Sequence, residues 1–128
     1  ATVEHFEPLP EKLYEQGVGC ATLDVQREHP HAKDTRFAAE AATAYARLPA
    51  GVHEGLMVAE DGSILEGLSS NFFALLDGTL YTEEARVLLG ITRGVILELA
   101  TADVVRLLRA DAHRFQRFPP DKWCMRGS

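Results

Sequence analysis

Short blocks of alternating apolar and polar positions along the chain predict a mixed α/β fold. Residues 19–25, Gly-Cys-Ala-Thr-Leu-Asp-Val, predict a strand, and Thr35 begins a helix that we expect to reach about Leu48. The apolar face of this helix recurs at helical spacing in Phe37, Ala41, Ala44, Tyr45 and Leu48. Pro49-Ala50-Gly51 should end it, because neither Pro nor Gly continues a helix readily.

Two Asp-Gly pairs between apolar runs predict two β-hairpins. The pair at 61–62 separates residues 55–59 from 64–65, and the pair at 77–78 separates residues 71–76 from 79–81. A tight hairpin turn needs positive φ angles, which glycine adopts without strain.

The rest of the chain adds one helix and two short strands to the prediction. Gly90-Ile91-Thr92 should open a helix that runs through Ala100, and residues 103–108 and 122–125 are expected to be strands. Residues 1–16 are polar and contain prolines, so no core element is predicted there. Without a repeat or linker, the chain is expected to be one domain.

Composition narrows the class of protein. The chain has 128 residues, of which 46% are hydrophobic and 25% charged, as in soluble globular domains. A net charge of −6 argues against nucleic-acid binding, which favours a basic face. No apolar run approaches the ~20 residues of a membrane span, and no signal peptide is evident, so we expect a cytoplasmic protein. No His or Cys spacing matches a metal site.

Three groups of residues have the chemistry needed to hold pyridoxal 5′-phosphate (PLP). Lys33 lies between a predicted strand and helix, and a lysine amine can bond to the cofactor aldehyde. Glu66 could keep the pyridine nitrogen protonated, while the helix start at 90–92, with Ser69 and Ser70, could bind the phosphate. Each group also has an ordinary interpretation. Lys33 could be a surface lysine and Glu66 a solvent-facing strand end, while Thr92 could simply cap a helix and Ser69-Ser70 form a polar loop.

Together these residues resemble the class IV (fold type IV) PLP-dependent enzymes. That family comprises branched-chain aminotransferases, D-amino-acid aminotransferases and 4-amino-4-deoxychorismate lyases. The matching blocks are residues 30–33, 62–73, 77–82, 88–93 and 98–100. The resemblance implies the large, C-terminal PLP-binding domain of the D-amino-acid aminotransferase-like fold across residues 1–128. The small N-terminal domain and the extreme C-terminal tail are expected to be absent.

The resemblance also implies a role for individual residues. Lys33 would be the Schiff-base lysine and proton shuttle, Glu66 would face the pyridine nitrogen, and Leu88 would pack on the ring. The residues implied at the phosphate and around the cofactor are Ser69, Ser70, Gly90, Ile91, Thr92 and Ser128.

The function implied is a PLP-dependent aminotransferase of amino-acid metabolism, transferring an amino group between an amino acid and a 2-keto acid. Residues 66–73 are more similar to the D-amino-acid branch than to the branched-chain branch. The family resemblance further implies a homodimer acting on small molecules, with exposed apolar surface where a missing domain would pack. Two alternatives stay open: a pyruvate-releasing 4-amino-4-deoxychorismate lyase, and a catalytically silent domain that supports assembly.

Overall fold

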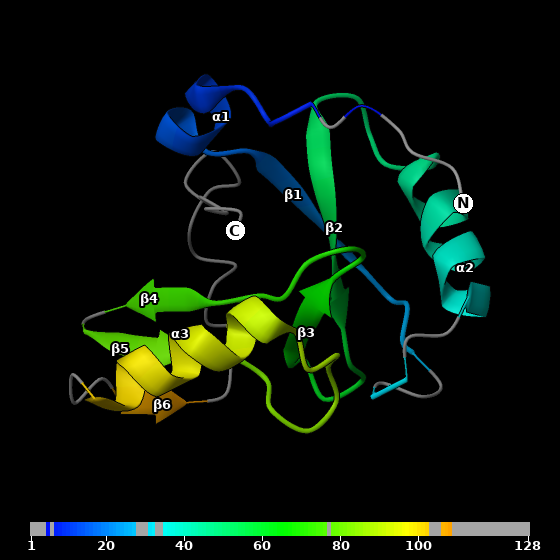
Figure 1. The fold of residues 1–128 in the computed structure, drawn as a ribbon. Helices are drawn as coiled ribbons and strands as arrows, with labels where there is room; N and C mark the ends of the chain where they lie inside the picture. The colour runs from blue at the N-terminus through cyan, green and yellow to red at the C-terminus, as the bar shows by residue number, and fades with distance from the viewer. Residues whose placement is uncertain are drawn as a thin grey trace.

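A computed structural model describes residues 5, 7–27, 31–32, 35–76, 78–102 and 106–108 (Figure 1). Two three-stranded sheets and three helices make up this part of the chain. Lys33, Ser128 and the strand expected at 122–125 lie outside the described residues, so their predicted roles stay predictions. The mixture of helices and paired strands confirms the predicted α/β class.

The first sheet has the order β1-β2-β3, formed by β1 (Gly19–Leu23), β2 (Val52–Val58) and β3 (Ile64–Gly67). Strands β1 and β2 are parallel, and helix α2 (Thr35–Tyr45) lies in the connection between them. A parallel pair requires such a crossover. Strand β3 returns antiparallel to β2 after the 61–62 turn, where Gly62 has a φ of 81°, which confirms the first predicted hairpin.

The second sheet has the order β4-β5-β6, with β4 (Ala74–Leu76), β5 (Thr79–Tyr81) and β6 (Arg106–Leu108). The β4–β5 hairpin closes at Gly78, whose φ of 71° suits the predicted turn. Strand β6 runs parallel to β5, and helix α3 (Ile91–Ala102) connects the two strands. In Figure 1 α3 lies beside this sheet, whereas α2 lies beside the first one.

Helix α1 (Glu11–Gln16) is an element that the sequence pattern did not predict. It has 6 residues, none of them buried, and ends at Gly17 with a φ of 75°. A helix this short is marginal in isolation, so its local sequence carries little signal. The expectation that residues 1–16 do not build the core agrees with the exposure of α1.

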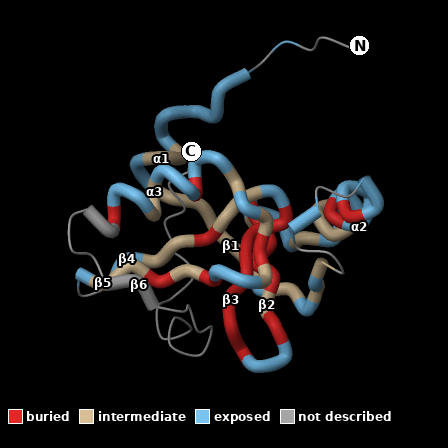
Figure 2. Tube along the Cα trace, turned by 60° about the horizontal axis from the view of Figure 1, so that its bottom comes forward, coloured by how far each residue is buried: buried red, intermediate tan, exposed pale blue. Residues whose placement is uncertain are grey.

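The core lies on both sides of β2 and β3, whose residues are the most continuously buried in the described part of the chain (Figure 2). Successive strand residues point to opposite faces, and Leu56 and Met57 accordingly belong to different clusters. Burial of Phe37 and Ala41 confirms the predicted apolar face of α2. The cluster beneath α2 contains Phe37, Ala41, Met57, Ala59, Leu65, Leu68 and Val87. The other cluster, which links the first sheet to the β4–β5 hairpin, contains Leu56, Ile64, Phe72 and Tyr81.

Candidate functional site

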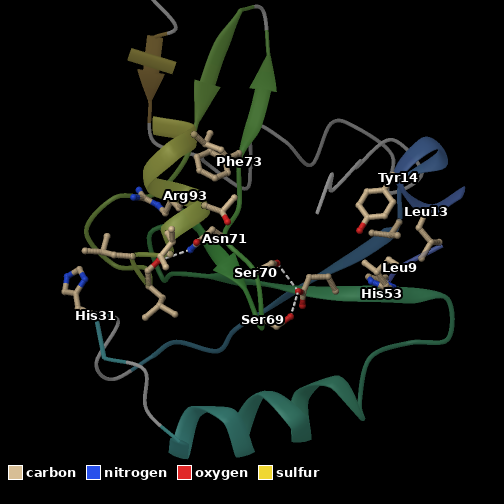
Figure 3. A pocket seen from close by; sticks show the side chains of 18 residues that line it. Leu9, Leu13, Tyr14, His31, His53, Ser69, Ser70, Asn71, Phe73 and Arg93 are labelled. Carbon is tan, nitrogen blue, oxygen red and sulfur yellow. Dashed lines mark hydrogen bonds between the residues drawn. The ribbon is translucent and has the colours of Figure 1, made fainter. Parts of the chain in front are cut away.

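A cavity of about 710 Å³ opens between the first sheet, the segment around α1 and the start of α3 (Figure 3). Its volume falls within the range of roughly 300–1,000 Å³ that is typical of small-molecule sites. The predicted site residues on its wall are Ser69, Ser70, Leu88, Gly90, Ile91 and Thr92. His31 also lines it, and Lys33 follows two positions later in the sequence. The fold therefore brings together residues that the sequence placed in three separate blocks.

The N-terminus of α3 reaches the wall of this cavity. The first intrahelical bond runs from the Gly94 N–H to the Gly90 carbonyl over 3.1 Å, so the N–H groups of Ile91, Thr92 and Arg93 precede it. Such N–H groups, together with the positive end of the helix dipole, favour a phosphate. Gly90 is needed here because a Cβ atom at this position would lie 2.6 Å from the Asn71 Oδ1 atom.

Glu66 is buried, with an exposed fraction of 2%, and does not itself line the cavity, although its partners Asn71 and Leu88 do. Its Oε1 atom accepts from Arg27 Nε at 2.7 Å, and its Oε2 atom accepts from Asn71 Nδ2 at 3.0 Å and from the Leu88 N–H at 3.1 Å. Burial raises the pKa of Glu66, and the Arg27 charge with these hydrogen bonds opposes that rise. A carboxylate has about four acceptor positions, so the described contacts leave room for one further N–H donor.

Asn71 connects Glu66 to the segment that begins α3. Its Nδ2 atom donates to Glu66 and also to the Leu88 carbonyl at 2.9 Å, while the Leu88 N–H donates back to Glu66. The acid and the backbone that leads to the helix N-terminus are therefore held in one fixed arrangement. Asn71 was predicted only as part of a strand, because its partner Leu88 is 17 positions away.

Two further residues of the site were not recognised from the sequence. Arg27 pairs with Glu66 and stacks over Phe37, with 3.7 Å between the guanidinium carbon and the ring centroid. Glu54, on β2, accepts hydrogen bonds from Ser69 and Ser70 over 3.2 and 3.0 Å. A charged residue inside the otherwise apolar run of β2 was the available signal for Glu54. The Arg27 contact has no comparable local signal.

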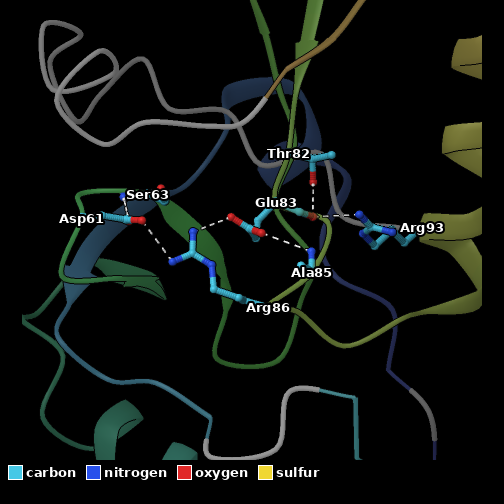
Figure 4. A network of polar contacts seen from close by, with 7 residues as sticks. All are labelled: Asp61, Ser63, Thr82, Glu83, Ala85, Arg86 and Arg93. Carbon is cyan, nitrogen blue, oxygen red and sulfur yellow. Dashed lines mark hydrogen bonds and ion pairs between the residues drawn. The ribbon is translucent and has the colours of Figure 1, made fainter.

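A second polar network holds the chain between β5 and α3 (Figure 4). Arg86 Nη2 donates to Glu83 Oε2 at 2.7 Å, and Arg86 Nη1 donates to Asp61 Oδ2 at 3.3 Å. Glu83 Oε1 accepts from the Ala85 N–H at 3.1 Å, and the Glu83 carbonyl accepts from Arg93 Nη2 at 2.7 Å. Arg93 lies in the first turn of α3, and its bond to the Glu83 carbonyl joins this segment to the helix through the backbone, independently of the Glu83 carboxylate.

The described residues include no group of three or more His, Cys, Asp and Glu side chains arranged to hold a metal ion. Within the same ranges, no helix is long and apolar enough to cross a membrane.

Comparisons with known proteins identify relatives of this chain. A branched-chain-amino-acid aminotransferase of Pseudomonas aeruginosa is 29% identical over 121 residues, covering 89% of this chain and 39% of that protein. The crystal structure of a branched-chain amino acid aminotransferase with pyridoxamine 5′-phosphate matches with a TM-score of 0.72 and 28% identity, over 87% of this chain and 39% of that one. A 4-amino-4-deoxychorismate lyase from Pseudomonas aeruginosa matches with a TM-score of 0.66 and 25% identity, covering 86% of this chain and 44% of that chain.

The chain thus spans about two fifths of the length of the first relatives it matches. The family model described as "Amino-transferase class IV" matches residues 1–115, which is most of the sequence. Together with the shared fold, this match confirms the resemblance drawn from the sequence blocks. The chain belongs to the class IV aminotransferase family.

Proposed function

We propose that this chain is the cofactor-binding part of a PLP-dependent enzyme that transfers an amino group between an amino acid and a 2-keto acid. One observation carries the proposal: Asn71 and Leu88 join the buried Glu66 carboxylate to the N-terminus of α3. Asn71, Leu88 and the helix start line the cavity, with Glu66 buried behind them, so this network would connect an acid for a ring nitrogen to an anion site for a phosphate, in a chain of the class IV family.

The residues at the cavity fit the chemical groups of this cofactor. The N–H groups of Ile91 and Thr92, with the Thr92 hydroxyl, would bind the phosphate, and Gly90 allows its close approach. The remaining acceptor position of Glu66 suits a protonated ring nitrogen, and Leu88 would pack on the ring. When bound, PLP supplies an aldehyde that bonds to amines and a ring that withdraws electrons from the substrate.

Lys33 is the residue proposed to bond to the cofactor aldehyde and to move a proton during the reaction. Its Nζ atom would take the proton from the α-carbon of the substrate and return it later. The position of His31 on the cavity wall supports this role, because Lys33 follows it by two positions. Glu66 and Arg27 would stay paired and hydrogen-bonded to each other while Lys33 acts.

The remainder of the substrate pocket is proposed to come from protein outside this chain, since the chain spans 39% of a relative such as the Pseudomonas aeruginosa aminotransferase. One face of α3 supports this proposal: Ile91, Val95 and Leu99 are 91%, 50% and 62% exposed. Apolar side chains on one helix face favour burial against another domain or subunit. A cytoplasmic homodimer that uses small amino acids and keto acids fits these features.

The lyase stays a second candidate, because a 4-amino-4-deoxychorismate lyase matches over 86% of this chain with a TM-score of 0.66. Product analysis separates the two activities. A lyase would release pyruvate from aminodeoxychorismate without a keto-acid acceptor, whereas an aminotransferase needs such an acceptor.

The test is amino-group transfer measured with PLP, a panel of L- and D-amino acids and 2-oxoglutarate. Assayed together with the protein that completes the pocket, the wild-type chain should form the matching keto acid, and Lys33→Ala should lose this activity while its far-UV circular dichroism is unchanged. Lys12→Ala, a substitution on the exposed α1 helix, is the matched control and should retain full activity. A Lys33→Ala variant as active as the control would disprove the role of Lys33, and a wild-type chain that turns over none of these substrates would favour a silent domain.

A further inference from the structure

We propose that Glu54 is a positioning residue that holds the Ser69–Ser70 turn against the cavity and makes both serines hydrogen-bond acceptors toward a ligand. The inference rests on the proposed function, since it concerns the same cavity. Glu54 and both serines line that cavity, and Glu54 is only 4% exposed (Figure 3). A carboxylate buried to this extent is costly unless donors satisfy it.

The Glu54 carboxylate is satisfied by donors from three parts of the chain. Its Oε1 atom accepts from the Tyr45 hydroxyl of α2 at 2.7 Å, the Gly55 N–H at 2.9 Å and the Leu68 N–H at 3.3 Å. Its Oε2 atom accepts from the hydroxyls of Ser69 at 3.2 Å and Ser70 at 3.0 Å. One buried side chain therefore joins α2, β2 and the turn that follows β3.

The backbone of the turn is shaped around this carboxylate. The Gly67 N–H donates to the Ser70 carbonyl at 2.7 Å, and the Leu68 N–H donates to the Gly55 carbonyl at 3.0 Å. A Cβ atom on Gly67 would lie 2.9 Å from the Glu54 Oε2 atom and would also meet the Ser70 hydroxyl. Only glycine leaves space for the carboxylate and the serine to approach each other.

The direction of these hydrogen bonds sets what the serines offer to the cavity. A hydroxyl has one hydrogen to donate and two lone pairs, whereas an ionised carboxylate only accepts. The Ser70 hydrogen points at Glu54, and the Ser69 hydrogen is used by either Glu54 or Tyr45, so both serines keep lone pairs for a ligand. The turn is therefore suited to N–H or O–H groups, such as the ring hydroxyl of PLP or the ammonium group of an amino acid. The alternative from the sequence, that both serines donate to a phosphate, would require them to release these hydrogen bonds to Glu54.

Tyr45 reinforces this arrangement. Its hydroxyl lies 2.7 Å from both Glu54 Oε1 and Ser69 Oγ. Its single hydrogen goes either to Glu54, in which case Ser69 donates to Tyr45, or to Ser69, in which case Ser69 donates to Glu54. In both arrangements the Ser69 hydrogen is used within this network. Burial, and then the hydrogen bond to Glu54, raise the pKa of Tyr45 to about 12, so the hydroxyl keeps its hydrogen at neutral pH.

Glu83 offers a matched control within the same chain. It is 5% exposed and is bonded to Arg86 and to the Ala85 N–H, yet it does not line the cavity. Replacing either glutamate by glutamine removes a buried carboxylate. Only the Glu54 change should also disturb the orientation of groups that face a ligand.

The experiment measures the dissociation constant of PLP, by absorbance titration, for the wild-type chain, Glu54→Gln and Glu83→Gln. We expect Glu54→Gln to bind PLP about tenfold more weakly, which is about 1.4 kcal/mol and within the range of one net hydrogen bond. Glu83→Gln should lower the midpoint of urea denaturation while its affinity for PLP changes by less than about twofold. In a chain that already carries Ser69→Ala and Ser70→Ala, Glu54→Gln should weaken binding no further.

The proposal would be overturned if Glu54→Gln bound PLP as tightly as the wild type. It would also be overturned if Glu54→Gln weakened PLP binding as strongly in the Ser69→Ala/Ser70→Ala chain as in the wild type. If Glu54→Gln does not fold, Tyr45→Phe replaces it, because this change removes one donor and retains the carboxylate. Tyr45→Phe should then weaken binding several-fold, and unchanged affinity would overturn the proposal. A wild-type chain without saturable PLP binding would instead contradict the proposed function and, with it, the role of Glu54.

Discussion

Replacing Arg27 with methionine is expected to lower the free energy of unfolding by about 3–5 kcal/mol. Arg27 Nε lies 2.7 Å from Glu66 Oε1, and the two side chains are 10% and 3% exposed. Methionine retains much of the apolar stem that packs on Phe37 and removes the charge. The substitution leaves the Glu66 carboxylate buried without its cationic partner. Removing one partner of a buried ion pair is strongly destabilising because the remaining charge is uncompensated.

The magnitude follows from burial, and the chain contains an exposed pair for comparison. Arg86 and Asp61 are 3.3 Å apart, with side chains 35% and 50% exposed. Exposed pairs contribute about 0–1 kcal/mol, so Asp61→Asn should cost less than about 1 kcal/mol. The double variant Arg27→Met/Glu66→Gln should recover most of the stability lost in Arg27→Met, because no unpaired buried charge remains.

Urea denaturation followed by far-UV circular dichroism measures the wild type and the three variants under one set of conditions. The penalty of Arg27→Met should shrink at acidic pH, where Glu66 becomes protonated and needs no cation. The reasoning is refuted if Arg27→Met costs no more than Asp61→Asn, or if the double variant is less stable than Arg27→Met alone.

Two further predictions concern Glu66 and Gly90. Burial raises the pKa of Glu66 above the usual 4.5, so the folded chain keeps the carboxyl proton of Glu66 to higher pH than the unfolded chain does. The wild type should therefore lose stability relative to Glu66→Gln as pH rises from 4.5 through the folded-state pKa of Glu66. Denaturation series at mildly acidic to neutral pH measure this difference, and a pH-independent difference would contradict the shift. Gly90→Ala should weaken the binding of PLP in calorimetric titration, since the added Cβ atom would lie 2.6 Å from Asn71 Oδ1. Gly94→Ala is its control: nothing lies within 4 Å of that Cβ, so affinity should be unchanged and helix stability should rise by up to about 1 kcal/mol.

Local patterns were sufficient to predict most of the secondary structure. The two Asp-Gly turns contain Gly62 and Gly78 at positive φ, and their signal lies in the turn itself together with the apolar runs beside it. Helix α2 was expected to reach Leu48 but ends at Tyr45. In the residues that follow, hydrogen bonds span three positions instead of the four of an α-helix, such as Leu48 N–H to the Tyr45 carbonyl at 3.1 Å, as the chain approaches Pro49.

The polar contacts of the site could be predicted only in part. The residues of the cavity wall, such as Ser70 and Thr92, came from blocks that resemble the family. Partners such as Arg27 for Glu66 and Tyr45 for Glu54 are 39 and 9 positions apart. Their pairing depends on how β2, β3 and α2 pack, and neither hydrophobic spacing nor turn chemistry encodes it.

The most direct test of a PLP site at this cavity is to titrate the chain with PLP, reduce it with borohydride and locate the modified lysine by peptide mapping. We expect saturable binding and a single label on Lys33. Absence of saturable binding, or equal labelling of Lys12, Lys33 and Lys122, would contradict the assignment of this cavity as the cofactor site.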